Sequence, residues 1–166
     1  SRDRLAEAAG LCRKKLGLKV TEPIHDICGL LEHAGVKVFP VPMASDSFFG
    51  LSVGEEDGGP AVVVNVWERI SVERRIFSAA HELGHIMLHP DAFDVAKVDE
   101  SKEEEQEADH FAGHFLMPND GFRKEWNEAA GLHFVDRVFK VKRIFRVSYK
   151  TVLSRLLEEG AVDKST

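Results

Sequence analysis

The stretch that decides the fold is residues 80–86, Ala-His-Glu-Leu-Gly-His-Ile, which carries the pattern H-E-x-x-H within an apolar, helix-compatible run. Residues four apart lie on one face of a helix, so His81 and His85 can direct two imidazoles at one point. Two neutral imidazoles at this spacing suit zinc. Glu82 is the next residue round the helix, where its carboxylate can take a proton from a metal-bound water. The stretch predicts a catalytic zinc site with Glu82 as general base.

The alternative is a chance match on a core helix whose two histidines make ordinary hydrogen bonds. The flanks argue against it, because an apolar stripe runs beside the motif and not through it. The stripe consists of Ile76, Ala80, Leu83 and Met87. Ser71 is a good N-cap and Pro90 a stop, so we expect the active-site helix to lie between them.

Composition places few limits on function. The chain has 166 residues, 22 basic and 28 acidic, for a net charge of −6, so nothing global suggests nucleic acid. Cys12 and Cys28 are expected to be free thiols in a reducing compartment. We find no apolar run long enough to cross a membrane and no signal peptide, and we expect a cytoplasmic protein without membrane contact. The first residue is Ser, which is compatible with a further N-terminal module.

Periodicity predicts an α+β fold, with a small antiparallel β-sheet packed on the active-site helix and surrounded by helices. Helices are expected at 4–16, 23–34, 71–89, 101–117 and 119–130, with two more between 132 and 160. Three short β-like runs, at 36–41, 48–53 and 61–66, predict an antiparallel meander. The last two runs precede the active-site helix, so we expect one of them to present an edge beside the metal. An extended protein substrate could add to that edge as another strand.

A catalytic zinc needs a third protein ligand, and several residues could supply it. His89 continues the i, i+4 series, but it lies about 12 Å of helix rise beyond His81, too far to share one ion. We expect it to be a helix C-terminal residue favoured by the dipole. The acidic helix offers Glu105, with Glu104 and Glu107 as alternatives.

Two further features of the acidic helix bear on the site. Asp109 lies one turn from Glu105, where it can accept a hydrogen bond from the far nitrogen of a ligating histidine. Ala108 is small, as a close approach of two helices requires. His110 and His114 are four apart on the same helix. Either could stabilise the transition state or be a satisfied core histidine, and we favour the second interpretation.

Three segments together, 74–85, 105–112 (Glu-Gln-Glu-Ala-Asp-His-Phe-Ala) and 115–118 (Phe-Leu-Met-Pro), resemble the ImmA/IrrE family of zinc metallopeptidase domains. The resemblance extends over roughly residues 20–160. It implies a zincin-like, gluzincin-type fold with one Zn²⁺ per chain, bound by His81, His85 and Glu105. The family usually has Asn where this chain has Asp109, a departure that bears on how a ligating histidine is oriented.

Members of this family act in bacterial or phage-related regulatory circuits of transcription and stress response, where they cleave or inactivate a repressor with a helix-turn-helix. The resemblance therefore implies an intracellular zinc endopeptidase acting on a regulatory DNA-binding protein. The acidic run 91–104 could attract such a basic partner. The alternative is a non-catalytic regulatory or sensing module that keeps the fold. An oxyanion donor is not assigned by sequence; His110, His114 and Tyr149 are candidates.

The C-terminal part, 132–166, is expected to be a helical appendage that closes the peptidase domain formed by residues 1–131. Residues 147–152 look like the turn and second helix of a helix-turn-helix, but Arg146 stands where the turn usually has Gly. The segment is basic, so DNA contact is conceivable. We favour a structural pair of helices, because a single such unit would read DNA poorly. An apolar stripe is expected to pack inward, namely Phe134, Val138, Val141 and Phe145.

Overall fold

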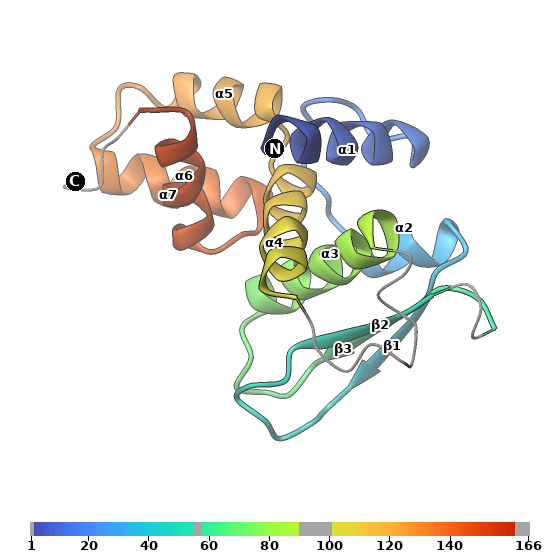
Figure 1. Cartoon of the computed structure of the whole chain (residues 1–166). Helices are drawn as coiled ribbons and strands as arrows, with labels where there is room; N and C mark the ends of the chain where they lie inside the picture. Colours follow the sequence, from blue (N-terminus) through green and yellow to red (C-terminus); the bar gives the residue numbers. More distant parts are fainter. Residues whose placement is uncertain (1, 55–57, 90–100, 162–166) are drawn as a thin grey trace.

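The structure is a computed structural model, which describes residues 2–54, 58–89 and 101–161. Within these ranges the chain forms seven helices and three strands (Figure 1). In chain order they are α1 (Arg2–Lys15), α2 (Ile27–His33), β1 (Lys37–Val41), β2 (Gly50–Val53), β3 (Ala61–Asn65), α3 (Val72–Leu88), α4 (Lys102–Leu116), α5 (Asn119–Glu128), α6 (Phe134–Phe145) and α7 (Tyr149–Glu158). The predicted α+β class is confirmed.

The sheet is mixed, so the predicted antiparallel meander is wrong. Its strand order is β1-β3-β2, in which β1 runs parallel to β3 and β2 runs antiparallel to it. The central place goes to β3, the most buried of the three strands. The connection between β1 and β2 crosses the position that β3 later occupies, so β3 comes to lie between them. Asn65, fully buried at the end of β3, holds this connection by donating to the carbonyls of Met43 and Phe48.

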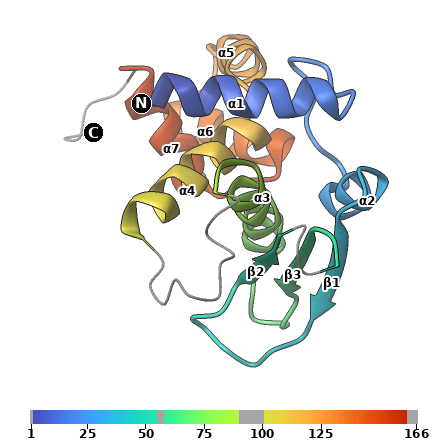
Figure 2. The same cartoon turned by 45° about the vertical axis from the view of Figure 1, so that its right-hand side comes forward.

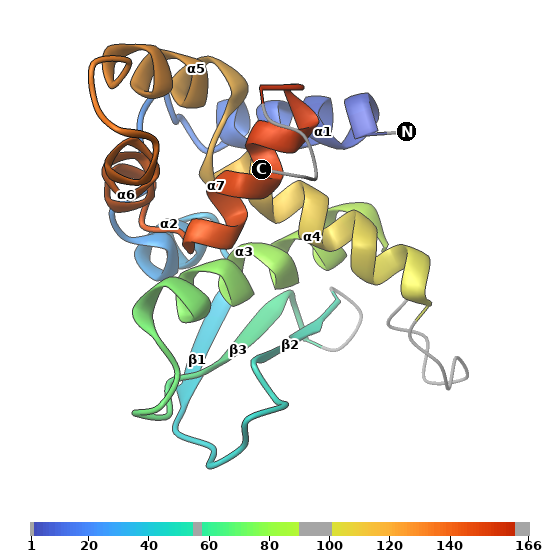
Figure 3. The same cartoon turned by 90° about the vertical axis from the view of Figure 1, so that its left-hand side faces the viewer.

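Helix α3 lies across one face of the sheet, and in the described part of the chain the other helices lie on the same side (Figures 1 and 3). It begins where predicted, because the side chain of Ser71 accepts a hydrogen bond from the backbone N–H of Arg74. The start predicted for α2, at 23, is wrong. Asp26 is the N-cap of α2 and accepts from the N–H of Gly29, so the helix begins at Ile27.

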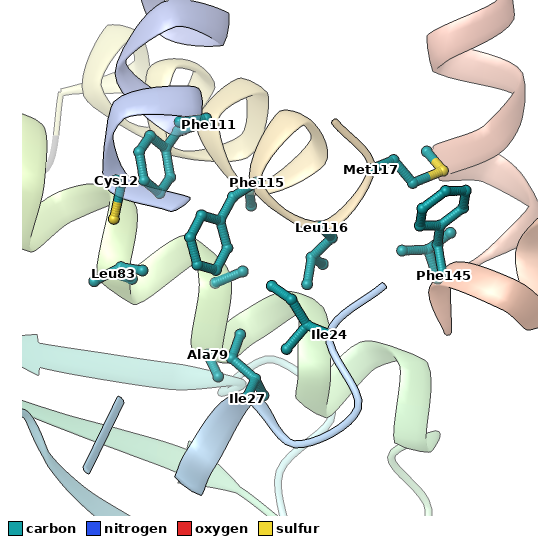
Figure 4. Close-up of a cluster of buried hydrophobic side chains, with 14 of the residues drawn as sticks. Cys12, Ile24, Ile27, Ala79, Leu83, Phe111, Phe115, Leu116, Met117 and Phe145 are labelled. Carbon is teal, nitrogen blue, oxygen red and sulfur yellow. The ribbon is translucent and has the colours of Figure 1, made fainter. Parts of the chain in front are cut away.

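Helices α3 and α4 pack closely enough to bring their polar residues together. A Cβ atom added to Gly84 would lie 3.2 Å from Cα of Ala108 and 3.1 Å from the ring of Phe111. The expected role of Ala108 in a close helix approach is thus confirmed. At this crossing, the rings of Phe111 and Phe115 stack with their centroids 5.7 Å apart. Both belong to the core cluster that Figure 4 shows.

Helix α1 runs over α4 (Figure 2). A buried arginine joins the two helices. Arg13 is only 2% exposed, and it donates to the carbonyl of Phe115 at 2.7 Å and to the carbonyls of Lys19 and Glu22. The neighbouring Cys12 is buried and its thiol is free, as predicted, like that of Cys28. Burial raises the pKa of Cys12 to about 11, so this thiol is protonated at neutral pH.

Helices α6 and α7 are joined by a turn that begins at Arg146, whose φ of 54° lies in the left-handed region. Arg146 thus adopts the conformation that Gly usually supplies in such a turn. Of the predicted apolar stripe, Val138, Val141 and Phe145 are buried. Phe134 is 41% exposed, and its ring makes an edge contact with the ring of Trp126.

Two further expectations concern surface and membrane. Met87, expected in the core stripe of the active-site helix, is 42% exposed, so the prediction is wrong for this residue. None of the described helices is both long and apolar enough to cross a membrane. The boundary expected between residues 131 and 132 stays a prediction.

Candidate active site

Three side chains from α3 and α4 converge beside the sheet: His81, His85 and Glu105. Nε2 of His85 lies 3.0 Å from Nε2 of His81 and 2.8 Å from Oε1 of Glu105. Nε2 of His81 lies 3.3 Å from Oε2 of the same carboxylate. One ligand atom from each residue can be chosen so that all lie within 4.8 Å of one another, which is close enough to hold a metal ion. Neither Glu104 nor Glu107 takes part in this cluster.

Each histidine of the cluster has a partner at its far nitrogen. Nδ1 of His81 lies 2.8 Å from Oδ1 of Asp109, the contact expected from the sequence. Nδ1 of His85 lies 3.2 Å from Nδ1 of His89, whose Nε2 is 3.1 Å from Oε2 of Glu107. Burial lowers the pKa of His81, but the hydrogen bond and charge of Asp109 outweigh it and raise the pKa above its ordinary value. Burial and the neighbouring His81 lower the pKa of His85.

Glu82 is buried next to the cluster, with 8% of its surface exposed. Oε2 of its carboxylate accepts a 2.7 Å hydrogen bond from the hydroxyl of Ser52 on β2. Gly50, on the same face of β2, allows the strand to pass close by. A Cβ atom at Gly50 would lie only 2.9 Å from Oε1 of Glu82. The edge strand and the motif helix are therefore fitted to each other at this carboxylate.

The cluster opens into a cleft of about 1470 Å³. One wall is the edge strand β2, and the opposite wall includes α7, with Thr151, Ser154 and Arg155. In a helix-turn-helix formed by α6 and α7, the second helix, α7, would enter the DNA groove. Here residues of α7 line the cleft instead. The cleft is thus lined both by the histidines and Glu82 of α3 and by residues of strand β2.

His110 and His114 lie in the cleft wall and are bound to α7. Nδ1 of His110 lies 3.1 Å from Oε1 of Glu158. His114 is buried between Asn119, at 3.1 Å, and Nη1 of Arg155, also at 3.1 Å. Burial and the charge of Arg155 lower the pKa of His114 to about 4, so it is neutral at pH 7. Its contacts fit the interpretation of a satisfied core histidine.

Tyr149 and His110 differ in their access to the site. Tyr149 is 48% exposed and is not among the described residues that line the cleft. His110 does line it, and its ring is held by Glu158. Of the three candidates for an oxyanion donor, His110 is therefore the one best placed to meet a substrate.

Sequence reasoning missed Ser52 and the contacts of His89. The spacing of His89 after His85 was a usable signal, because i, i+4 neighbours meet on a helix even when they cannot share a metal. For Ser52 the sequence holds no comparable signal, since it is 30 residues from Glu82 and the contact depends on the sheet order.

The comparisons with known proteins bear on the family and the fold of the chain. The model of the IrrE N-terminal-like domain, named peptidase M78, matches residues 31–157. No curated protein matches the chain. A similar solved structure is a Mycobacterium tuberculosis transcriptional regulator, with a TM-score of 0.62 and 20% identity. The match covers 92% of this chain and 46% of the regulator, so the chain spans about half of that protein and shares its fold there. By the extent of the family match, the chain belongs to the peptidase M78 family of IrrE N-terminal-like domains.

Proposed function

We propose that the chain is a zinc-dependent endopeptidase in which His81, His85 and Glu105 hold one Zn²⁺ and Glu82 is the general base. The observation that carries the proposal is the convergence of two imidazole nitrogens and a carboxylate within 4.8 Å, at the floor of a cleft. Membership of a peptidase family supports it.

The residues present fit zinc by their chemistry. Nitrogen and carboxylate donors are those that zinc takes in hydrolases, and three protein ligands leave one coordination position open. Bound there, zinc would supply Lewis-acid chemistry, lowering the pKa of water and polarising a carbonyl. Asp109, beside the far nitrogen of His81, supports the orientation that a ligand needs.

The chain's own part in peptide hydrolysis falls to Glu82. Its carboxylate accepts the proton of the attacking water and returns it to the leaving amine. The hydrogen bond from Ser52 to Oε2 helps to aim this carboxylate. The ring of His110, held by Glu158, is the cleft-wall group that we assign to the substrate carbonyl.

The substrate we propose is an extended protein segment. Among the residues that the structure describes, strand β2 pairs with β3 alone, and its residues Gly50, Leu51 and Ser52 line the cleft. A segment that adds to this edge would be held by main-chain hydrogen bonds, with alternate side chains entering the cleft. This mode of binding favours an exposed or locally unfolded stretch of a protein over a small molecule.

We infer that the protein substrate is a cytoplasmic helix-turn-helix repressor. The name of the similar structure, a transcriptional regulator, supports a regulatory setting. The first turn of α4 is acidic, and its residues Glu103 and Glu104, which lie outside the metal-binding cluster, would attract a basic DNA-binding protein. Most of the acidic run expected to do this, 91–100, lies outside the described residues. Direct DNA binding by α6–α7 is less favoured, because α7 lines the cleft.

The competing candidate is a regulatory module that keeps the peptidase fold and binds or senses instead of cleaving. Co-expression of a candidate helix-turn-helix repressor, if one is encoded beside this chain, with wild-type chain and with Glu82→Gln, followed by mass spectrometry of the repressor, separates the two. We expect one specific cut with wild type and none with Glu82→Gln. A repressor that stays intact with both proteins, while its DNA binding is still lost, would favour the non-catalytic module. General digestion of unrelated unfolded proteins would contradict the specific regulator.

A further inference from the structure

A histidine and a carboxylate lie directly behind His85, on the side away from Glu105. His89 is the C-cap of α3, and only 7% of its side chain is exposed. Its Nδ1 is 3.2 Å from Nδ1 of His85, and its Nε2 is 3.1 Å from Oε2 of Glu107. These contacts form a line from α4 through His89 to the metal-binding cluster.

The direction of the hydrogen bonds follows from the geometry of His85. Its Nε2 faces Glu105 at 2.8 Å and His81 at 3.0 Å, so Nε2 is the atom that would bind a metal. A neutral imidazole that binds through Nε2 carries its hydrogen on Nδ1. In the described part of the chain, Nδ1 of His89, at 3.2 Å, is the acceptor placed to receive that hydrogen. His89 must then carry its own hydrogen on Nε2, where it donates to Glu107.

We propose that His89 and Glu107 are positioning residues of the metal site, which fix the tautomer and ring orientation of His85. The inference rests on the proposed zinc site and deepens it. Asp109 contacts His81 directly, whereas Glu107 contacts His85 only through His89. Such partners raise the basicity of a ligating histidine and hold it in the binding geometry. A helix-dipole role alone would not require the contact with Glu107.

Glu107 also meets the N-terminal helix, which provides a control. Its Oε1 lies 3.4 Å from Nη2 of Arg4, whose side chain is 69% exposed. An ion pair this exposed contributes little, because water screens it. Arg4→Ala therefore removes a contact of Glu107 without touching the line to His85. Glu103→Gln is the second control, since it removes one negative charge from the exposed side of α4.

The first test is zinc affinity, measured by competition with a chromophoric chelator. His89→Leu and Glu107→Gln should weaken zinc binding by about 10- to 100-fold. His89→Asn, whose amide oxygen can replace Nδ1 as acceptor, should recover most of the loss. Arg4→Ala and Glu103→Gln should bind as wild type does. Wild-type affinity in His89→Leu, or an equal loss in His89→Asn and His89→Leu, would overturn the proposal.

The second test needs no variant. Nitrogen-15 NMR of the histidine rings in the zinc-loaded wild-type chain should find the hydrogen of His85 on Nδ1 and that of His89 on Nε2. A hydrogen on Nδ1 of His89 would overturn the proposal even if the variants failed to fold. The two levels of failure are distinguishable. A wild-type chain that binds no zinc removes the metal site itself, and with it this proposal. Zinc binding that is indifferent to His89 removes only the positioning role.

Discussion

The hydroxyl of Ser52 donates a 2.7 Å hydrogen bond to Oε2 of Glu82, and this bond joins the edge strand β2 to the carboxylate of the H-E-x-x-H motif. Both residues are 8% exposed. Since side chains two apart lie on one face of a strand, Gly50 and Ser52 meet Glu82 together. The strand proposed to receive the substrate is therefore also the strand that holds the proposed base.

Ser52→Ala should lower kcat by about 10-fold, because a hydrogen bond to a charged group contributes about 1.5–3 kcal/mol. KM and zinc content should change little, since the substitution removes one buried hydroxyl and leaves the main chain of β2 and the three proposed ligands in place. Ser52→Thr keeps the hydroxyl and should restore most of kcat. Ser154→Ala, which removes an exposed hydroxyl from the opposite cleft wall, is the matched control. Wild-type kcat in Ser52→Ala would show that the bond does not serve catalysis.

Glu82→Gln should bind zinc and fold as wild type does but lose cleavage, because an amide cannot accept the proton of water. Zinc content and intact mass of the substrate after incubation are the two measurements. The change is nearly isosteric, and the amide can still accept the hydrogen bond of Ser52. Cleavage at a near wild-type rate would mean that another residue is the base.

Gly84→Ala should destabilise the protein by about 1–3 kcal/mol, as overpacking of a tight contact does. The added Cβ would lie 3.2 Å from Cα of Ala108 and 3.1 Å from the Phe111 ring, so α3 and α4 must move apart. Zinc affinity should fall with it, since the ligands come from both helices. Gly113→Ala in α4 is the control, because no atom lies within 4 Å of its Cβ position. Urea unfolding of the metal-free proteins checks this, and equal effects of the two substitutions would contradict it.

The helices could largely be predicted from the sequence, because their signals are local. Ser71 and Ser101 cap α3 and α4 where expected, and the register of α4 places Glu105 and Asp109 opposite the motif helix. The sheet order could not be predicted, because it depends on the path of the connection between β1 and β2. That path is held by Asn65, whose partners Met43 and Phe48 lie about 20 residues away along the chain.

The contacts that support the site also divide into those that could be predicted from the sequence and those that could not. Asp109 could be assigned to a ligating histidine because helix periodicity puts it one turn from Glu105. Ser52 could not be assigned to Glu82, because the sequence does not reveal which strand forms the edge next to α3. His89 was visible at i, i+4 from His85, but its burial and its contact with Glu107 depend on how α4 packs.

Acidification should cost the wild-type chain more stability than His114→Gln. Burial and the charge of Arg155 lower the pKa of His114 to about 4, from the ordinary histidine value of 6.5 that applies in the unfolded chain. Between pH 4 and 6.5 the unfolded state binds a proton at His114 that the folded state does not bind. The free energy of unfolding is therefore not reduced by this histidine above pH 6.5, and it falls as the pH drops from 6.5 toward 4. Urea unfolding with chelator present should show a shrinking difference between the two proteins over this window. A difference independent of pH would contradict the assignment.

Glu105→Ala should weaken zinc binding by at least about 10-fold, because it removes one of three protein ligands. Glu104→Ala, a neighbouring carboxylate outside the cluster, should bind nearly as wild type does, and Asp109→Ala should fall between them. Chelator competition measures all three. A variant order in which Glu104→Ala is the most damaging would assign the third ligand to a different register of α4.

The most direct measurement is elemental analysis of the wild-type chain, purified without chelator and without added metal. The account predicts about one zinc per chain, bound through His81, His85 and Glu105. If the purified chain is empty, titration with zinc should fill the site to the same stoichiometry. A chain that carries no divalent metal and takes up no zinc on titration would contradict the peptidase proposal.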